Sequence, residues 1–131
     1  GMPVNVQWDD TEQNIVRWEM SGSLDAESFF AAQDKTFELT QDLTDRLDII
    51  VHLTPDVRLP VGFIGTLASG ERRVQRMGNT NPSNSVVIVA NSTLAKAFLD
   101  LFLKLGYTDR WFSAPTLEAA YTRIAQDRAG V

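Results

Sequence analysis

Residues 92–106 read STLAKAFLDLFLKLG, residues 107–113 read YTDRWFS and residues 114–124 read APTLEAAYTRI. The first segment begins with residues that cap helices, continues with leucine and phenylalanine at helical spacing, and ends at Gly106, a common helix C-terminus. A short strand containing Trp111 and Phe112 follows. The last segment predicts an amphipathic helix with Leu117, Ala120, Tyr121 and Ile124 on its inner face. Helix, strand and helix in this order are typical of the closing unit of a small α/β domain.

The N-terminal part of the sequence predicts a hairpin followed by a helix. Apolar and polar residues alternate in residues 4–8 and 16–20, which favours two half-buried strands joined by a turn. Ser23 and Asp25 are both suitable N-caps for a helix that begins near Ala26. The spacing of its apolar residues places one stripe toward the core, made of Ala26, Phe29, Phe30, Gln33 and Phe37.

Two apolar runs, residues 47–53 and 86–90, predict central strands covered on both faces. The helix between them should begin near Pro60, which suits a first turn, and end at Gly78. Asn91 or Ser92 should cap the next helix. The predicted order is β-β-α-β-α-β-α-β-α, an α/β fold whose five-stranded sheet is mostly parallel, with an antiparallel N-terminal edge strand and four helices.

Composition favours one ordinary globular domain. The 131 residues predict a single domain over residues 2–131, and Gly1 ahead of Met2 is interpreted as a remnant of tag removal. The apolar runs are too short to span a membrane and no signal segment opens the chain, so we expect no membrane association and a cytoplasmic location. The absence of cysteine and the single histidine exclude thiolate and histidine-rich metal sites. No phosphate-binding loop or dinucleotide-binding motif occurs, so we expect no metal and no cofactor.

The net charge of −5 argues against nucleic-acid binding, which needs a basic face to neutralise phosphates. Arg72, Arg73 and Arg76 lie close together on a predicted helix and are the exception. They could bind an anion, but a solvated helix face is the interpretation that we prefer.

Three segments together resemble the STAS domain, the family of bacterial anti-sigma-factor antagonists. Residues 21–25, SGSLD, look like the family's Gly-x-Leu-Asp turn, and residues 49–54, IIVHLT, look like its central strand. The third segment is the helix ending at Gly106 with the strand and helix that follow, including residues 116–120. The resemblance covers most of the chain and implies the same fold and a regulatory, non-enzymatic role.

The chain departs from the family where the phosphorylatable serine or threonine is expected. Matching Gly65 and Leu67 to the family motif puts Pro60, Val61 and Gly62 at the expected Asp-Ser-Ser positions, so the acceptor hydroxyl is missing. The resemblance therefore implies binding of a protein partner without the usual phosphoswitch. The partner surface that it predicts is the start of the second helix with the adjoining loop: Asp56, Arg58, Pro60, Val61, Gly62 and Gly65.

Two other functions stay open at this point. Ligands bind at the carboxyl ends of parallel strands, so Thr54, Asn91 and Ser92 are candidates for a small ligand or lipid-like molecule, although capping explains Asn91 and Ser92 equally well. A cavity lined by Phe29, Phe63 or Phe98 would support that function. An enzyme using His52 with Asp56 or Arg58 is the remaining hypothesis, and a lone histidine in an apolar strand argues against it.

The helix from Leu94 to residue 105 is apolar on most of its circumference. Leu94, Phe98, Leu101 and Leu105 form one stripe, and further leucine and phenylalanine residues widen it. Either neighbouring helices cover this surface, or it is the interface of a homodimer or another partner.

Overall fold

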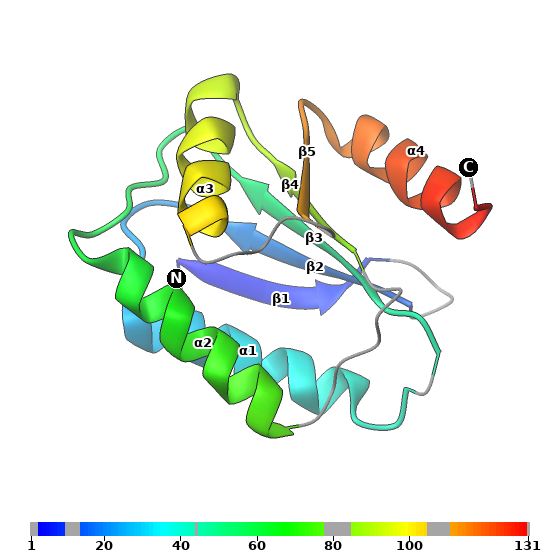
Figure 1. The fold of residues 1–131 in the computed structure, drawn as a ribbon, viewed down its shortest axis with the longest axis horizontal. Coiled ribbons are helices and arrows are strands. Elements are labelled where there is room, and N and C mark those ends of the chain that lie inside the picture. Colours follow the sequence, from blue (N-terminus) through cyan, green and yellow to red (C-terminus); the bar gives the residue numbers. More distant parts are fainter. Residues whose placement is uncertain (1–2, 10–13, 44, 78–84, 105–110, 131) are drawn as a thin grey trace.

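The chain folds into one sheet flanked by helices (Figure 1). The computed structural model describes residues 3–9, 14–43, 45–77, 85–104 and 111–130. Within these ranges the strands are β1 (Val4–Trp8), β2 (Ile15–Met20), β3 (Asp48–Leu53), β4 (Val86–Val89) and β5 (Trp111–Ala114). The helices are α1 (Ala26–Thr40), α2 (Phe63–Met77), α3 (Ser92–Lys104) and α4 (Leu117–Arg128). This order confirms the predicted α/β fold.

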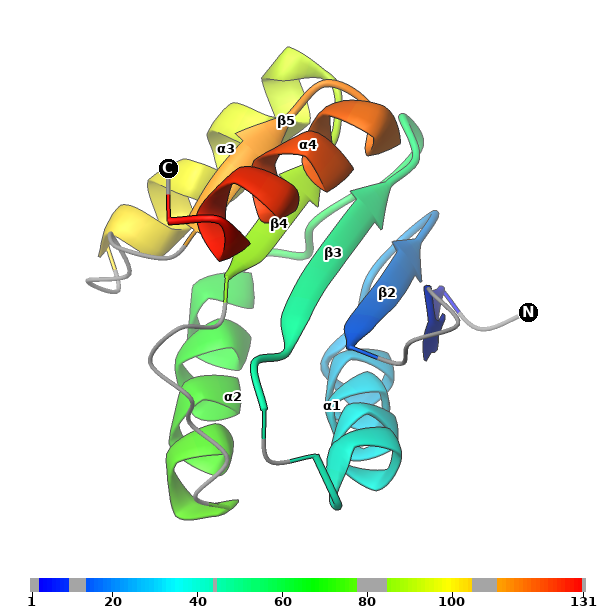
Figure 2. The same cartoon turned by 90° about the vertical axis from the view of Figure 1, so that its right-hand side faces the viewer.

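The strands lie side by side in the order β1-β2-β3-β4-β5, with β1 antiparallel to β2 and each later pair parallel. Each new parallel strand is therefore added on the same side of the one before it. Because such crossovers are right-handed, the three connecting helices must all lie on one face of the sheet. The helix after the last strand, α4, lies on the other face (Figure 2).

The two faces carry cores of different size. The core under α1, α2 and α3 contains Trp18, Met20, Phe63 and Phe98, together with partly buried Phe29. The core under α4 is smaller and contains Ile15, Ile50, Val87, Val89, Ala114, Ala120 and Ile124. The predicted inner face of α4 is correct at Ala120 and Ile124, whereas Tyr121 is exposed and its hydroxyl donates to Asp9 Oδ1 over 2.9 Å.

Helix α1 turns only part of the predicted stripe inward: Gln33 is buried and Phe29 packs against the main core. Its buried residues are Ser28, Ala32, Gln33, Thr36 and Thr40, while Ala26 is exposed and the phenylalanines are half-buried. Small hydroxyl residues are acceptable there because their donors are satisfied: Thr36 Oγ1 and Thr40 Oγ1 each donate to a carbonyl one turn earlier. Thr36 Oγ1 also accepts from the buried Trp18 Nε1 at 2.9 Å.

Helix α2 begins at Phe63, three residues later than the sequence predicts. Gly62 has a φ of 81°, outside the helical region, so residues from Pro60 to Gly62 form a turn whose carbonyls accept from Phe63 and Gly65. Of the two predicted caps, Asp25 caps α1 by accepting from the Ser28 amide at 2.7 Å. The predicted helix ends at Gly78 and Gly106 lie outside the described residues.

Candidate functional site

The predicted partner surface lies where β3 ends and the chain continues to α2 (Figure 1). This is the carboxyl edge of the parallel strands, where loops are free to vary while the sheet holds their ends. The loop begins at Thr54, whose amide donates to Met20 O at 3.0 Å and so extends the pairing of β3 with β2.

Thr54 and Asp56 form a local pair at the base of this loop. The Thr54 hydroxyl donates to Asp56 Oδ1. This hydrogen bond is the main reason that the pKa of Asp56 lies below its usual value. Desolvation is the next largest influence and raises the pKa, while backbone donors and the nearby Arg58 charge lower it further. Asp56 is therefore a fixed, exposed negative charge.

The middle of the loop is anchored to the turn before α1. The Arg58 amide donates to Gly22 O at 2.8 Å, and the Leu24 amide donates to Arg58 O at 3.0 Å. Gly22 has a φ of 66°, which glycine adopts at little cost. The backbone of Arg58 is thus held as a short bridge to Ser23, while its side chain is exposed.

Val61 stands fully exposed at the tip of the loop, with a relative exposure of 106%. The residues on either side of the tip, Val57 and Phe63, are buried to 5% and 3% exposure. Pro60, Gly62 and Gly65 are exposed as well. The structure therefore brings the six predicted partner-surface residues onto one anchored segment and presents an apolar side chain at its end.

The alternative ligand residues belong to separate loops. Asn91 Oδ1 accepts from the Leu94 amide at 2.9 Å, so Asn91 is the N-cap of α3, and Ser92 is exposed in its first turn. Thr54 is engaged with Asp56. Phe63 and Phe98 are buried in the main core, and the rings of Phe29 and Phe63 pack edge to face at 5.8 Å.

His52 lies on the face of the sheet that α4 covers in part. Its Nδ1 is 2.8 Å from Glu19 Oε2, and Arg17 Nε is 2.9 Å from the other oxygen of the same carboxylate. Arg17 also pairs with Asp9 at 3.2 Å. The histidine is thus engaged with β2, and Asp56 is engaged with Thr54.

The helix surfaces singled out from the sequence are described only in part. In α3, Phe98 is buried and Leu94 and Leu101 are half-buried against the main core, while Leu105 lies outside the described residues. Arg72 donates to Ser69 Oγ at 3.0 Å on an exposed part of α2, and the side chains of Arg73 and Arg76 also lie outside the described part of the chain.

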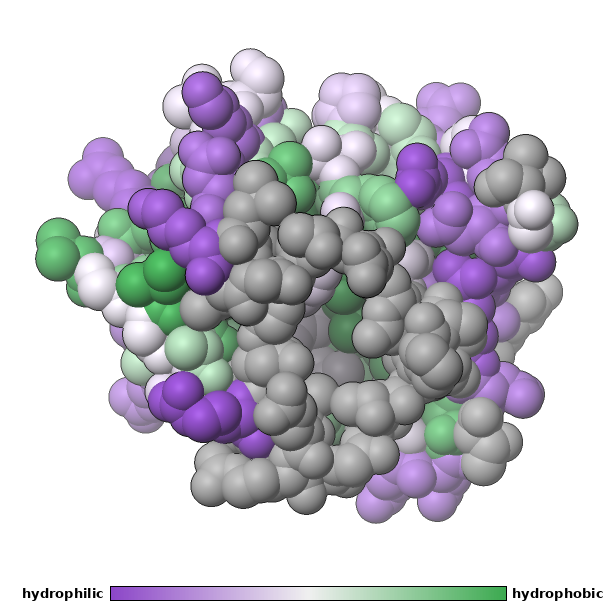
Figure 3. All heavy atoms as spheres, viewed as in Figure 1, coloured by the Kyte–Doolittle hydropathy of each residue, from purple (hydrophilic) through white to green (hydrophobic). Residues whose placement is uncertain are grey.

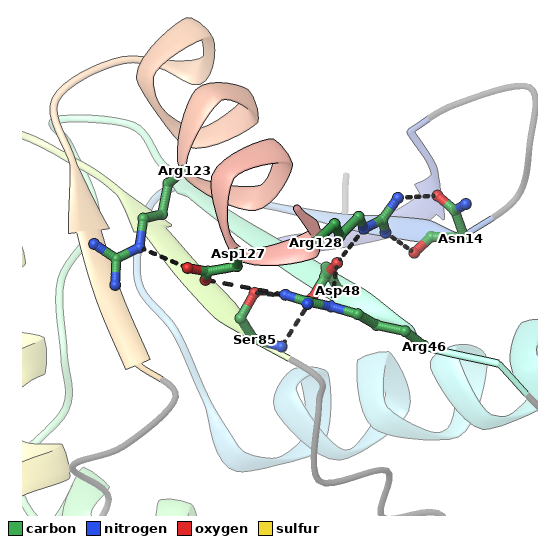
Figure 4. Close-up of polar contacts among 7 residues, drawn as sticks. All are labelled: Asn14, Arg46, Asp48, Ser85, Arg123, Asp127 and Arg128. Atoms are coloured by element: carbon green, nitrogen blue, oxygen red, sulfur yellow. Dashed lines mark hydrogen bonds and ion pairs between the residues drawn. The ribbon is translucent and has the colours of Figure 1, made fainter. Parts of the chain in front are cut away.

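Sequence reasoning missed a polar cluster at the opposite end of β3 (Figure 4). Asp48 is fully buried and accepts from Arg46 Nε at 3.0 Å and from Arg128 Nε at 2.7 Å. It also accepts from the Ser85 amide and hydroxyl at 2.9 and 2.8 Å. An aspartate at the start of an apolar strand was the only signal in the sequence.

This cluster joins segments far apart in the chain. Besides binding Asp48, Arg128 donates to the Asn14 side chain at 3.0 Å and to the Asn14 carbonyl at 3.1 Å. A buried carboxylate with two guanidinium partners and a hydroxyl has its hydrogen-bonding capacity filled by the protein itself. We interpret the cluster as a structural tie between α4 and the amino ends of the strands.

Across the described ranges, no group of three or more metal-ligating side chains comes together, and no helix is long and apolar enough to cross a membrane. Comparison of the chain with models of protein families, with curated proteins and with solved structures found no match.

Proposed function

We propose that the protein is a STAS-like, non-enzymatic regulatory module of the bacterial cytoplasm that binds a protein partner through the loop from Thr54 to Gly62 and the start of α2. The observation that carries this proposal is the fully exposed Val61 on an anchored loop. Burying a valine side chain contributes about 1.5–3 kcal/mol, so a partner that covers Val61 gains a central apolar contact.

The surroundings of Val61 support an interface with a charged rim. Asp56 is held ionised on one side of the loop and the exposed Arg58 adds the opposite charge. Figure 3 displays apolar atoms at the left of the view, over the region where α2 begins. An apolar centre with polar groups around it is the usual arrangement of a transient protein interface.

Binding would not depend on phosphorylation of the expected position. Pro60, Val61 and Gly62 carry no hydroxyl. Of the nearest hydroxyl residues, Thr54 is bonded to Asp56 and Thr66 is half-buried within α2. Control of the interaction would therefore lie in the amount or state of the partner.

The test is affinity capture from the native host with the wild-type chain and two variants. Val61→Asp adds a charge at the proposed contact, and Ala125→Asp adds the same charge at an exposed position of α4, on the other face of the sheet. A polypeptide retained by the wild type and by Ala125→Asp but lost with Val61→Asp supports the proposal. A polypeptide that binds all three equally would show that the contact lies elsewhere.

A further inference from the structure

The outer edge of β1 presents a regular row of backbone groups. β1 is the last strand of the sheet, and in Figure 2 no described helix lies beyond it. The hydrogen bonds from Ser21 to Pro3 and from Asp9 to Ile15 fix which residues of β1 face β2. Because antiparallel pairing alternates, Asn5 and Gln7 turn their amides and carbonyls toward β2. The amides and carbonyls of Val4, Val6 and Trp8 point outward.

Among the described residues, β1 carries none of three common protections of an exposed edge strand, namely a charged side chain, a proline within the strand or a bulge. The sequence of β1, VNVQW, contains no charge and no proline, and its register with β2 runs without a bulge. Val6 and Trp8 are half-buried, so part of each apolar side chain remains exposed beside the open backbone. The edge is thus ready to accept another strand.

The residue pattern of β1 is complementary to itself. In an antiparallel pair centred on Val6, Val6 faces the partner's Val6 and Val4 faces the partner's Trp8, while Asn5 faces the partner's Gln7. Val4, Val6 and Trp8 all point toward the main core, so their side chains would meet on one face. The amide side chains of Asn5 and Gln7 would meet on the other face, where each can donate and accept.

We propose that a second copy of this chain binds along β1 in antiparallel orientation, so that the two sheets become one continuous sheet with a two-fold axis at Val6. Every outward amide and carbonyl of Val4, Val6 and Trp8 then meets its counterpart in the partner. Two-fold pairing of one strand with itself is the simplest closed symmetry for a homodimer. The loop from Thr54 to Gly62 takes no part, so this dimer and the proposed regulatory contact are independent.

Amide hydrogen exchange at increasing protein concentration tests this pairing on the unmodified chain. We expect the amides of Asn5 and Gln7 to be protected at every concentration because β2 accepts them. The amides of Val4, Val6 and Trp8 should gain protection only as the dimer forms. Exchange of these three amides that stays fast and independent of concentration would overturn the proposal.

Two substitutions at the symmetry axis test the same pairing through the molar mass of the protein in solution. Val6→Pro removes an amide that β2 does not use, and proline is tolerated on an edge strand at such a position. Val6→Thr keeps the amide and the branched shape and is the matched control. In sedimentation equilibrium we expect dimers for the wild type and Val6→Thr, and monomers for Val6→Pro with an unchanged circular dichroism spectrum.

Two results would contradict the pairing through β1. The first is a wild-type chain that remains monomeric at high concentration. The second is a dimer that persists in folded Val6→Pro, which would place the interface elsewhere, with α3 the first alternative. If Val6→Pro fails to fold, the hydrogen exchange of the wild-type amides at increasing concentration still tests whether the dimer forms through β1.

Discussion

Thr54 and Asp56 show how one hydroxyl sets the charge of the proposed partner surface. The hydrogen bond from Thr54 favours the ionised carboxylate and is the largest cause of the lowered pKa of Asp56. Since Asp56 is exposed, the pair matters more for holding the loop and its charge than for the stability of the domain.

Replacing Thr54 by valine should raise the pKa of Asp56 toward 3.8, the ordinary value for an aspartate side chain. Because the pKa of Asp56 is lower in the folded than in the unfolded chain, its ionisation stabilises the fold at pH values above the unfolded pKa. This stabilisation is lost as the pH falls through the folded pKa, and it should be smaller in Thr54→Val. Nuclear magnetic resonance titration of the Asp56 carboxyl carbon measures the change. Thr122→Val removes an exposed hydroxyl of α4 and should leave the titration unaltered. An unchanged Asp56 curve in Thr54→Val would contradict the assigned cause.

At this scale the sequence identified the loop residues but few of their partners. Polar residues after an apolar strand indicate the edge of the sheet where sites form, which is why the sequence suggested Thr54 and Asp56 as candidates. The partner of His52 depends on the register of β3 against β2, which places Glu19 beside it. The sequence contains both residues and does not state that register.

Helices α1 and α2 approach each other closely at Gly70. Gln33 Nε2 donates to Gly70 O at 3.2 Å, and Phe29 packs against the same point. A Cβ on residue 70 would lie 2.6 Å from Phe29 Cε1 and 2.8 Å from Gln33 Nε2. The absence of a side chain at residue 70 is therefore what permits this approach.

Gly70→Ala should lower the free energy of unfolding by about 1–3 kcal/mol, because overpacking outweighs the better helix propensity of alanine. Gly65→Ala is the matched control in the same helix, where an added Cβ meets nothing within 4 Å. That change should be neutral or stabilise by up to about 1 kcal/mol. Urea denaturation of both variants measures the difference. Equal effects of the two substitutions would refute the close contact.

Element ends and inner faces were less predictable than element order. Periodicity located each helix. A turn ending at Gly62 makes α2 begin at Phe63, so Pro60 on its own predicts the start of the helix three residues too early. In α1, Thr36 faces inward because Trp18 supplies a hydrogen-bond donor from another element. A hydrophobicity pattern along one helix contains no information about such a partner.

Across the whole molecule, the Asp48 cluster joins the sheet to α4. Asp48→Ala would leave Arg46 and Arg128 without their shared carboxylate, and breaking a buried ion pair costs about 3–5 kcal/mol. We expect a loss of this size in the free energy of unfolding from urea denaturation. Lys35→Ala breaks an exposed pair with Glu38 and should cost less than about 1 kcal/mol. A loss for Asp48→Ala no larger than that of the control would contradict the structural tie.

The topology was predictable because few arrangements satisfy its rules. Right-handed crossovers and alternating elements reduce the possible topologies to a handful and predict a mostly parallel sheet with an antiparallel N-terminal strand. The strand order β1-β2-β3-β4-β5 was not predicted and comes from the structure. The cluster was not predictable, since Asp48, Ser85 and Arg128 meet only after the sheet has formed and α4 has docked.

The separation between Asp48 and Arg128 also has a consequence during synthesis. Arg128 follows Asp48 by 80 residues. At about 5–20 residues per second, the ribosome adds Arg128 on the order of 4–16 s after Asp48. During that interval the Asp48 carboxylate lacks one of its two guanidinium partners, and the smaller core on the other face of the sheet is not yet covered by α4. The nascent domain therefore acquires its full stability only after α4 has been synthesised, which favours late, concerted folding over folding strand by strand.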